Sequence, residues 1–78
     1  MNKVPYQIVE GILLGLPKAS KIDWLSQGSK TYFDIDDIVV AVPSDGIAAS
    51  HLGDILNDQI GMSWWMIDYI FGQNGIQP

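Results

Sequence analysis

The sequence predicts a single α+β domain of 78 residues, in the order helix, helix, β-hairpin, helix, helix. Three observations indicate this fold class. Apolar residues recur at three- and four-residue spacing on both sides of residues 30–42, which is the periodicity of a helix. Residues 30–42 instead alternate and then form a β-branched run, which is typical of strands. A chain of this length also has room for only one core.

The segment from Val4 to Leu16 fits a helix better than a strand. Its apolar residues stand at helical spacing, Pro5 suits the first helical position, and Pro17 ends the segment. Two glycines inside it each weaken a helix by about 1 kcal/mol relative to alanine, so a strand remains the alternative.

A second, short helix is expected from Ser20 to Gly28. Ser20 and Asp23 have the spacing of a capping box, and Gly28 follows as a stop. Two helices joined by a short turn have the outline of a helix-turn-helix unit. The second helix would offer only Lys21 as a base, so we do not expect it to bind DNA.

Residues Lys30 to Val42 are expected to form a β-hairpin. Residues 31–35 alternate between apolar and polar side chains, and residues 38–42 form a β-branched run that we expect to be buried on both sides. Asp36 and Asp37 mark the turn between the strands. Because this turn lacks glycine, a longer loop, or a helix capped by Asp34, remains an alternative.

The stretch from Pro43 to Gly72 is expected to hold two further helices. Ser44 or Asp45 can cap the first, which should begin near Gly46 and stop at Gly61. Its apolar stripe faces the core, and a polar, acidic face lies on another side of the helix. The residues of the stripe are Ala48, Ala49, Leu52, Ile55, Leu56 and Ile60.

The last helix is expected to start at Ser63 and to end before Gly72, with residues 73–78 as a loosely held tail. At roughly 12 Å it is too short to span a bilayer. Its side chains are apolar almost all round, with Asp68 as the polar marker. A helix of this kind is either fully buried or has one side available to a partner. We expect Trp64, Ile67 and Phe71 to pack in the core. Some of the others should remain outside as an apolar patch, namely some of Trp65, Met66, Tyr69 and Ile70.

Charge is divided unequally along the chain. Residues 1–30 hold four lysines and two acids, a sum of +2, whereas residues 31–78 hold seven aspartates and no base, a sum of −7. The chain has no arginine, so the bidentate phosphate and guanine contacts of most nucleic-acid-binding proteins are excluded. We therefore expect no direct nucleic-acid binding and a basic protein surface as partner.

Cysteine is absent, which excludes disulfides and thiolate metal sites. The N-terminal residues do not resemble a signal peptide, so we expect a cytoplasmic protein, in the host cytoplasm if it is phage-encoded. No cofactor motif is found.

Two groups of acidic residues are candidates for a metal site by residue type. His51, Asp54 and Asp58 share one predicted helical face, but no second histidine or cysteine exists to complete a zinc site. The second group lacks the glycine and glutamate of an EF-hand loop, so we expect no metal there. Its members are Asp34, Asp36 and Asp37.

The sequence does not predict an enzyme. Ser50 and His51 are adjacent on a helix, where neighbouring side chains diverge by about 100°, so they cannot act as a dyad. Asp36 and Asp37 would face opposite sides of a strand, which excludes a paired-carboxylate site.

The expected function is that of a small acidic protein-binding module. By size and charge it suits an inhibitor that occludes a nucleic-acid-binding surface of its partner, of the phage anti-defence or anti-CRISPR type. The alternative is a structural subunit that forms a homodimer or larger homo-oligomer through the aromatic last helix. The residues expected to bind the partner are Asp34, Asp36, Asp37, Asp54, Asp58, Trp65 and Tyr69.

Overall fold

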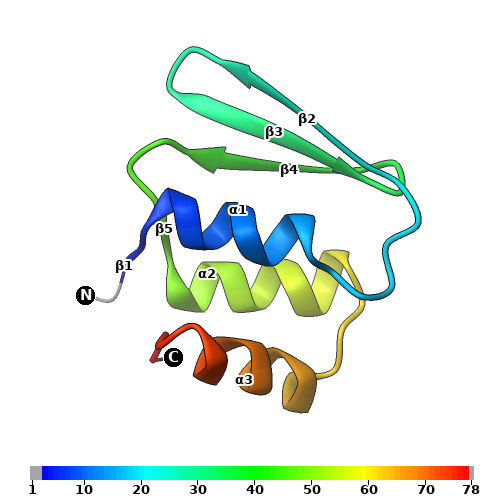
Figure 1. The fold of residues 1–78 in the computed structure, drawn as a ribbon, viewed down its shortest axis with the longest axis vertical. Helices are drawn as coiled ribbons and strands as arrows, with labels where there is room; N and C mark the ends of the chain where they lie inside the picture. The colour runs from blue at the N-terminus through cyan, green and yellow to red at the C-terminus, as the bar shows by residue number, and fades with distance from the viewer. Residues whose placement is uncertain (1–2, 78) are drawn as a thin grey trace.

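Three consecutive strands form an antiparallel sheet, and helices pack against one of its faces (Figure 1). The computed structural model describes residues 3–77. This arrangement confirms the predicted α+β class. In chain order the elements are β1 (Lys3–Val4), α1 (Tyr6–Leu14), β2 (Ile22–Gln27), β3 (Lys30–Ile35), β4 (Ile38–Pro43), β5 (Ile47–Ala48), α2 (Ala49–Asp54), the π-helix η1 (Ile55–Gln59) and α3 (Trp64–Gln73).

The strands pair in the order β2-β3-β4, and β1 pairs with β5 in a separate two-stranded ribbon. Along β3 the side chains of Thr31, Phe33 and Ile35 are buried, and those between them are exposed. This alternation, expected from the sequence, places one face of the sheet on the core. Figure 1 shows the β2–β3 hairpin at one end of the molecule and α3 at the other, with β4, α1 and α2 between them.

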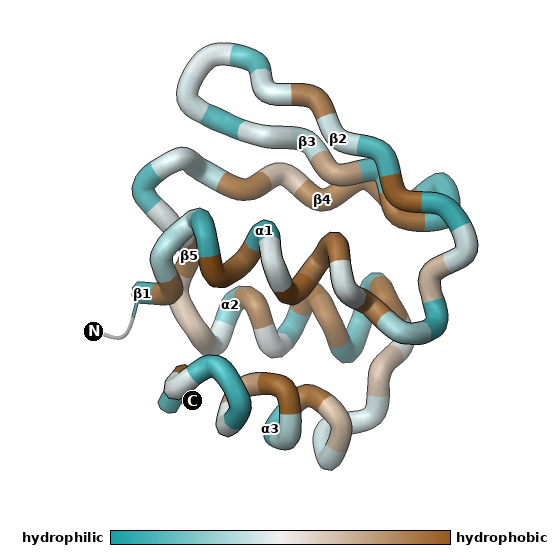
Figure 2. The backbone as a smooth tube through the Cα atoms, viewed as in Figure 1, coloured by the Kyte–Doolittle hydropathy of each residue, from teal (hydrophilic) through white to brown (hydrophobic). Residues whose placement is uncertain are grey.

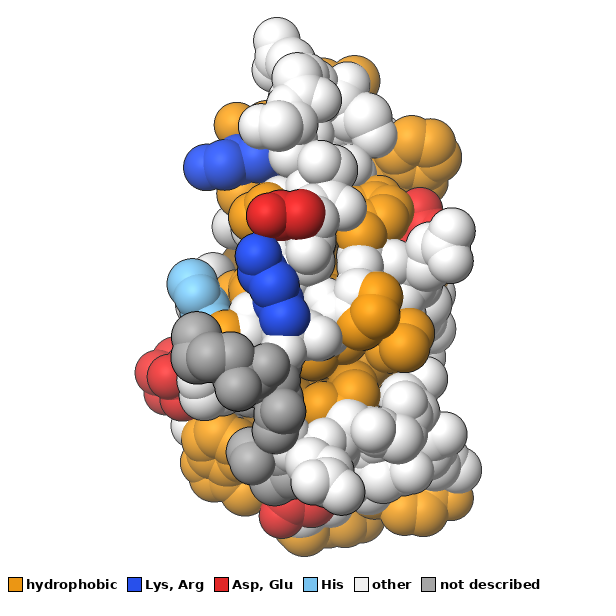
Figure 3. Space-filling model, turned by 90° about the vertical axis from the view of Figure 1, so that its left-hand side faces the viewer, with side chains coloured by type: hydrophobic (Ala, Val, Ile, Leu, Met, Phe, Trp, Pro, Cys, Tyr) orange, Lys and Arg blue, Asp and Glu red, His pale blue; other side chains and the backbone are white. Residues whose placement is uncertain are grey.

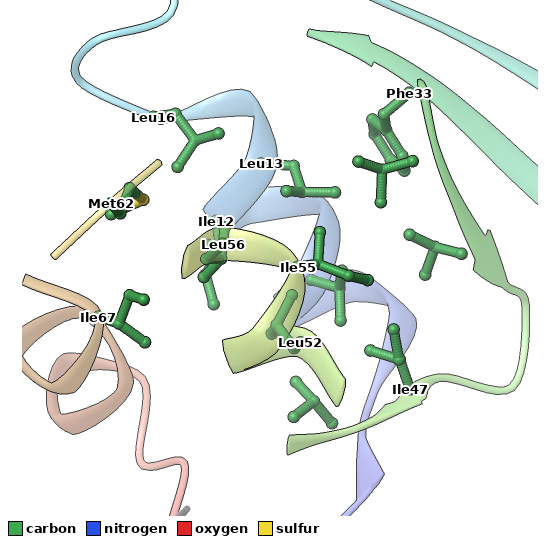
Figure 4. Close-up of a cluster of buried hydrophobic side chains, with 14 of the residues drawn as sticks. Ile12, Leu13, Leu16, Phe33, Ile47, Leu52, Ile55, Leu56, Met62 and Ile67 are labelled. Carbon is green, nitrogen blue, oxygen red and sulfur yellow. The ribbon is translucent and has the colours of Figure 1, made fainter. Parts of the chain in front are cut away.

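The core lies between the sheet and the helices. Figure 4 shows side chains of α1 and of the α2–η1 helix meeting between β3 and α3, and Figure 2 shows hydrophobic residues concentrated along α1 and β4. Its fully buried members come from six elements, so every layer contributes to one contiguous cluster. The largest of them are Phe33, Leu13, Ile35, Leu52, Leu56 and Ile67.

The helix predicted from Ser20 to Gly28 is wrong, because these residues form β2. Register with β3 runs without interruption from Ile22 opposite Ile35 to Gln27 opposite Lys30. The expected capping box does not form, since the backbone N–H of Ser20 donates to the carboxylate of Asp36 instead. Pairing with β3 therefore overrides a short local helix signal.

The helix predicted after Pro43 starts three residues later than expected. Gly46 has φ +99° and is buried, and β5 follows it, so α2 begins only at Ala49. Neither Ser44 nor Asp45 caps the helix. Gly61 ends it as predicted, with φ +84°.

The first and last helices are confirmed, but α3 continues through Gly72 to Gln73, so its expected end before Gly72 is wrong. Pro5 precedes α1 at the N-cap position rather than occupying its first turn. Ser63 holds the N-cap position of α3, where its carbonyl accepts hydrogen bonds from the N–H groups of Met66 and Ile67. Of the expected tail, Gln73 belongs to α3 and Ile76 is half-buried against the core, while Pro78 lies outside the described residues.

The predicted hairpin between residues 30 and 42 is also confirmed, with a turn of only two residues. Asp36 and Asp37 have φ +49° and +73°, the signs of a type I′ turn. Aspartate tolerates this left-handed region better than most residues other than glycine. The missing glycine therefore does not prevent a tight turn.

Glycine is required at position 46 by both conformation and space. A Cβ there would overlap the carbonyl oxygen of Val4, whereas a Cβ at Gly61, also at positive φ, would meet nothing within 4 Å. We expect Gly46→Ala to lower the free energy of unfolding by more than about 2 kcal/mol, and the matched Gly61→Ala by about 1 kcal/mol. Urea unfolding measures both, and equal losses would contradict the role of the overlap.

One ion pair joins the β1 segment to the turn before β5. The Lys3 Nζ donates to Asp45 Oδ2 at 3.1 Å, and this hydrogen bond and the lysine charge lower the pKa of Asp45. Because the folded pKa is lowered, the pair stabilises the fold above the ordinary aspartate pKa and loses this effect as the pH falls below it. Thermal unfolding of wild type and Asp45→Asn should differ slightly at about pH 7 and coincide at about pH 2. A difference that persists in acid would contradict this assignment.

Candidate protein-interaction surface

The last helix, α3, buries one side and exposes the other. Ile67 and Phe71, one turn apart, are buried in the core. Trp65 and Tyr69, also one turn apart, are 71% and 61% exposed. Asp68 lies between them in sequence and is exposed. The helix therefore presents Trp65, Tyr69 and the Asp68 carboxylate to solvent. Trp64, expected to pack inward, is also 48% exposed, so that expectation is wrong.

Two contacts hold α3 on the helix before it. The Asn57 side-chain amide donates to the carbonyl of Met62 at 2.8 Å and so fixes the connection between η1 and α3. The Trp64 indole lies over Gly53, where an added Cβ would be 3.1 Å from Trp64 Cζ3. Glycine at this position lets the half-exposed indole rest on α2.

The outward face of α2 and η1 is polar. His51, Asp54 and Asp58 are all exposed and line a shallow surface hollow with Ser50, Ile55 and Gln59. The two aspartates are one turn apart on the helix, and Asp54 directly follows the glycine beneath the Trp64 indole. We call Asp54, Asp58, Trp64, Trp65 and Tyr69 together the acidic–aromatic surface.

The aspartates of the β3–β4 turn have a structural role that sequence reasoning missed. The Asp36 carboxylate accepts hydrogen bonds from the backbone N–H groups of Ser20 and Lys21, at 3.0 and 2.8 Å. The Asp34 carboxylate accepts one from the N–H of Asp37 at 3.0 Å. Two of these three carboxylates therefore stabilise local structure. An aspartate pair closing a two-residue turn was the signal that could have indicated this role.

The seven residues expected to bind a partner lie on two parts of the surface. Asp54, Asp58, Trp65 and Tyr69 belong to adjoining helices, whereas the remaining three lie at the end of the β3–β4 hairpin. On the face shown in Figure 3, acidic side chains stand apart from one another, with lysines and hydrophobic side chains between them. Among residues 3–77, no group of three His, Cys, Asp or Glu side chains could hold a metal ion.

A small apolar cavity of about 70 Å³ lies between the hairpin turn and the start of α3. Its walls include Ile35 and Ile38 from the sheet and Met66 from α3, and Asp36 and Lys18 supply charged atoms. The cavity brings the hairpin turn and the start of α3 to one site. It was not predicted, because its walls come from three segments that are far apart in the chain, residues 16–19, 35–38 and 60–66.

Exposed apolar residues lie on both outer strands of the sheet. Trp24 and Leu25 of β2 are 55% and 64% exposed. Val39 of β4 is 60% exposed and Ala41 is exposed too, so the expected burial of residues 38–42 on both sides is wrong, because only one face of the sheet is covered. A helical segment would have placed at least one of these β2 side chains in the core. As a strand, β2 presents both to solvent.

Comparisons of the chain with protein-family models, with curated proteins and with solved structures found no match. Over residues 3–77, every helix is too short or too polar to cross a bilayer.

The role of Asp36 can be separated from the cost of its backbone conformation. Asp36→Ala and Asp37→Ala both place alanine at positive φ, but only the first removes a carboxylate bound to Ser20 and Lys21. We expect losses in the free energy of unfolding of about 2 kcal/mol and about 1 kcal/mol respectively. Chemical denaturation measures both, and a loss for Asp37→Ala as large as that for Asp36→Ala would contradict the proposed bonding role.

Proposed function

We propose that this protein acts by binding another protein, and that the acidic–aromatic surface makes the contact. The observation that carries this proposal is the exposure of Trp65 and Tyr69 on one side of α3. Tryptophan and tyrosine are the residues most often found as energetic anchors of interfaces. The side of α3 that packs on the core is formed by Ile67 and Phe71, so Trp65 and Tyr69 are not needed for the packing of this helix.

Charge favours a basic partner. Asp54 and Asp58 lie on the helix next to α3, Asp68 lies on α3 itself, and residues 31–78 contain no base. These carboxylates would attract lysine and arginine side chains of a partner, and the aromatic rings would be buried from water in the same contact. Such an arrangement raises the rate of association as well as the affinity.

The mechanism we propose is occlusion of a nucleic-acid-binding surface, carried out in the cytoplasm without catalysis or a cofactor. A lysine- and arginine-rich groove that binds phosphates is the common kind of basic protein surface, and a protein of 8.6 kDa is large enough to cover part of it. The phage anti-defence and anti-CRISPR type of inhibitor fits this size and charge. The apolar cavity beside Asp36 offers a place for one apolar side chain at the edge of such a contact.

The proposal is tested first by capture of a partner from the native host and then by titration calorimetry with that partner. We expect Trp65→Ala to weaken binding by about 30-fold or more, since an anchor of this type contributes about 2 kcal/mol. The control is Asp23→Asn on β2, at the other end of the molecule, which should leave the affinity unchanged.

Salt dependence tests the electrostatic part. Affinity should fall as the ionic strength rises and the Debye length shortens below about 10 Å, and the double variant Asp54→Asn, Asp58→Asn should show a smaller fall. If instead the exposed aromatic residues build a homo-oligomer, association would persist at high salt and be lost in Trp65→Ala. A salt-independent affinity for the captured partner would contradict the proposed charge complementarity.

A further inference from the structure

The strand β2 forms an open edge of the sheet. Among residues 3–77 it pairs with β3 and with no other strand. Its six residues carry no proline, and their register with β3 contains no bulge. Asp23 and every later residue of the strand are exposed. The common features that protect an edge from pairing are therefore missing from most of its length.

The register shows which backbone groups face this edge. The N–H of Asp36 donates to the carbonyl of Lys21 at 2.9 Å, so Lys21 points its backbone groups toward β3. Alternate residues of a strand point these groups to opposite sides. The N–H and C=O groups directed away from β3 are therefore those of Ile22, Trp24 and Ser26.

Apolar side chains stand on both faces of the same edge. Trp24 lies opposite Phe33, on the face that carries the core, yet it is 55% exposed. Leu25 lies opposite Tyr32 on the other face, where both are exposed. A strand added at this edge would receive backbone hydrogen bonds and cover apolar surface on both faces.

The charges of β2 suit a second copy of the same strand. Lys21 and Asp23 lie at its start, and no charged residue occurs from Trp24 to Ser29. In an antiparallel pair related by a two-fold axis, the charged half of each strand lies against the uncharged half of the other. The net charge of −5 resides mainly on elements away from this edge, so like charges do not meet across the axis.

We propose that β2 pairs antiparallel with β2 of a second copy, so that three strands from each copy form one continuous sheet. The register that uses all the outward groups is symmetric about Trp24, with Ile22 of each copy opposite Ser26 of the other. Such an edge contact buries on the order of 500 Å² per copy, at the low end for specific interfaces. We therefore expect reversible dimerisation in the micromolar range.

This dimer leaves the acidic–aromatic surface free. Figure 1 shows β2 and α3 at opposite ends of the molecule, so the two copies of that surface would lie at the far ends of the dimer. The dimer could then hold two partner molecules, or two sites of one oligomeric partner with increased avidity. Dimerisation itself does not depend on the proposed function.

Sedimentation of the full chain from about 1 µM to about 1 mM should show the mass rising from 8.6 kDa toward twice that value. Over the same range, hydrogen exchange at the amides of Trp24 and Ser26 should slow, because the dimer protects them. A monomer throughout this range, or unchanged exchange at both amides, would overturn the proposal.

Two matched lysine substitutions locate the interface. Trp24→Lys places like charges opposite each other at the two-fold axis and should abolish dimerisation, whereas Trp65→Lys, at an equally large exposed residue of α3, should leave it unchanged. Leu25→Lys, at a side chain 64% exposed, is a second edge variant should the first not fold. Dimerisation lost in Trp65→Lys but retained in either edge variant would overturn the proposal and assign the contact to α3.

Discussion

This small domain has one core, and each of its outer layers, the sheet and α3, packs against that core with one side only. The interior lies between the sheet and the α2–η1 helix, and α3 adds to it through Ile67 and Phe71. No further element lies beyond α3 or beyond the outer face of the sheet in residues 3–77 (Figure 1). Apolar residues on the far sides of these layers consequently face water, because a chain of this size lacks material to cover them. Trp65 and Tyr69 are exposed at one end of the molecule, and Trp24 and Leu25 at the other.

The aspartates of this chain carry equal charge but differ in what they do. Asp36 binds two backbone N–H groups and holds the α1–β2 loop to the hairpin turn, and Asp45 pairs with Lys3. Asp54 and Asp58 are exposed on the helical segment that precedes α3 in the chain. A count of charge from the sequence treats these residues alike. The hydrogen bonds in the structure show instead that Asp36 and Asp45 stabilise the fold. The second pair remains the better candidate for contact with a partner.

Much of the fold was predictable because local signals and tertiary contacts agree. The alternation of residues 31–35 gave β3, and the aspartate pair gave the hairpin turn. The helical periodicity of α1 and α3 coincides with the side that each buries.

The failures occurred where tertiary contacts decide. The residues of β2 after Ile22 are exposed, so no burial pattern distinguishes strand from helix there, and pairing with β3 determines its structure. The late start of α2 follows from the close approach of Gly46 to Val4, which is 42 residues distant in the chain. Of the candidate site, the exposure of Trp65 and Tyr69 was predictable from a helix apolar all round. The hydrogen bonds of Asp36 were not, because their donors lie in a segment predicted to be helical.

The central claim is that the exposed side of α3 is where a partner binds. Oxidative footprinting of the tryptophan and tyrosine side chains, with and without a partner captured from the host, tests it most directly. We predict that Trp65 and Tyr69 become protected in the complex. Protection confined to other side chains, with Trp65 and Tyr69 as reactive as in the free protein, would contradict the claim.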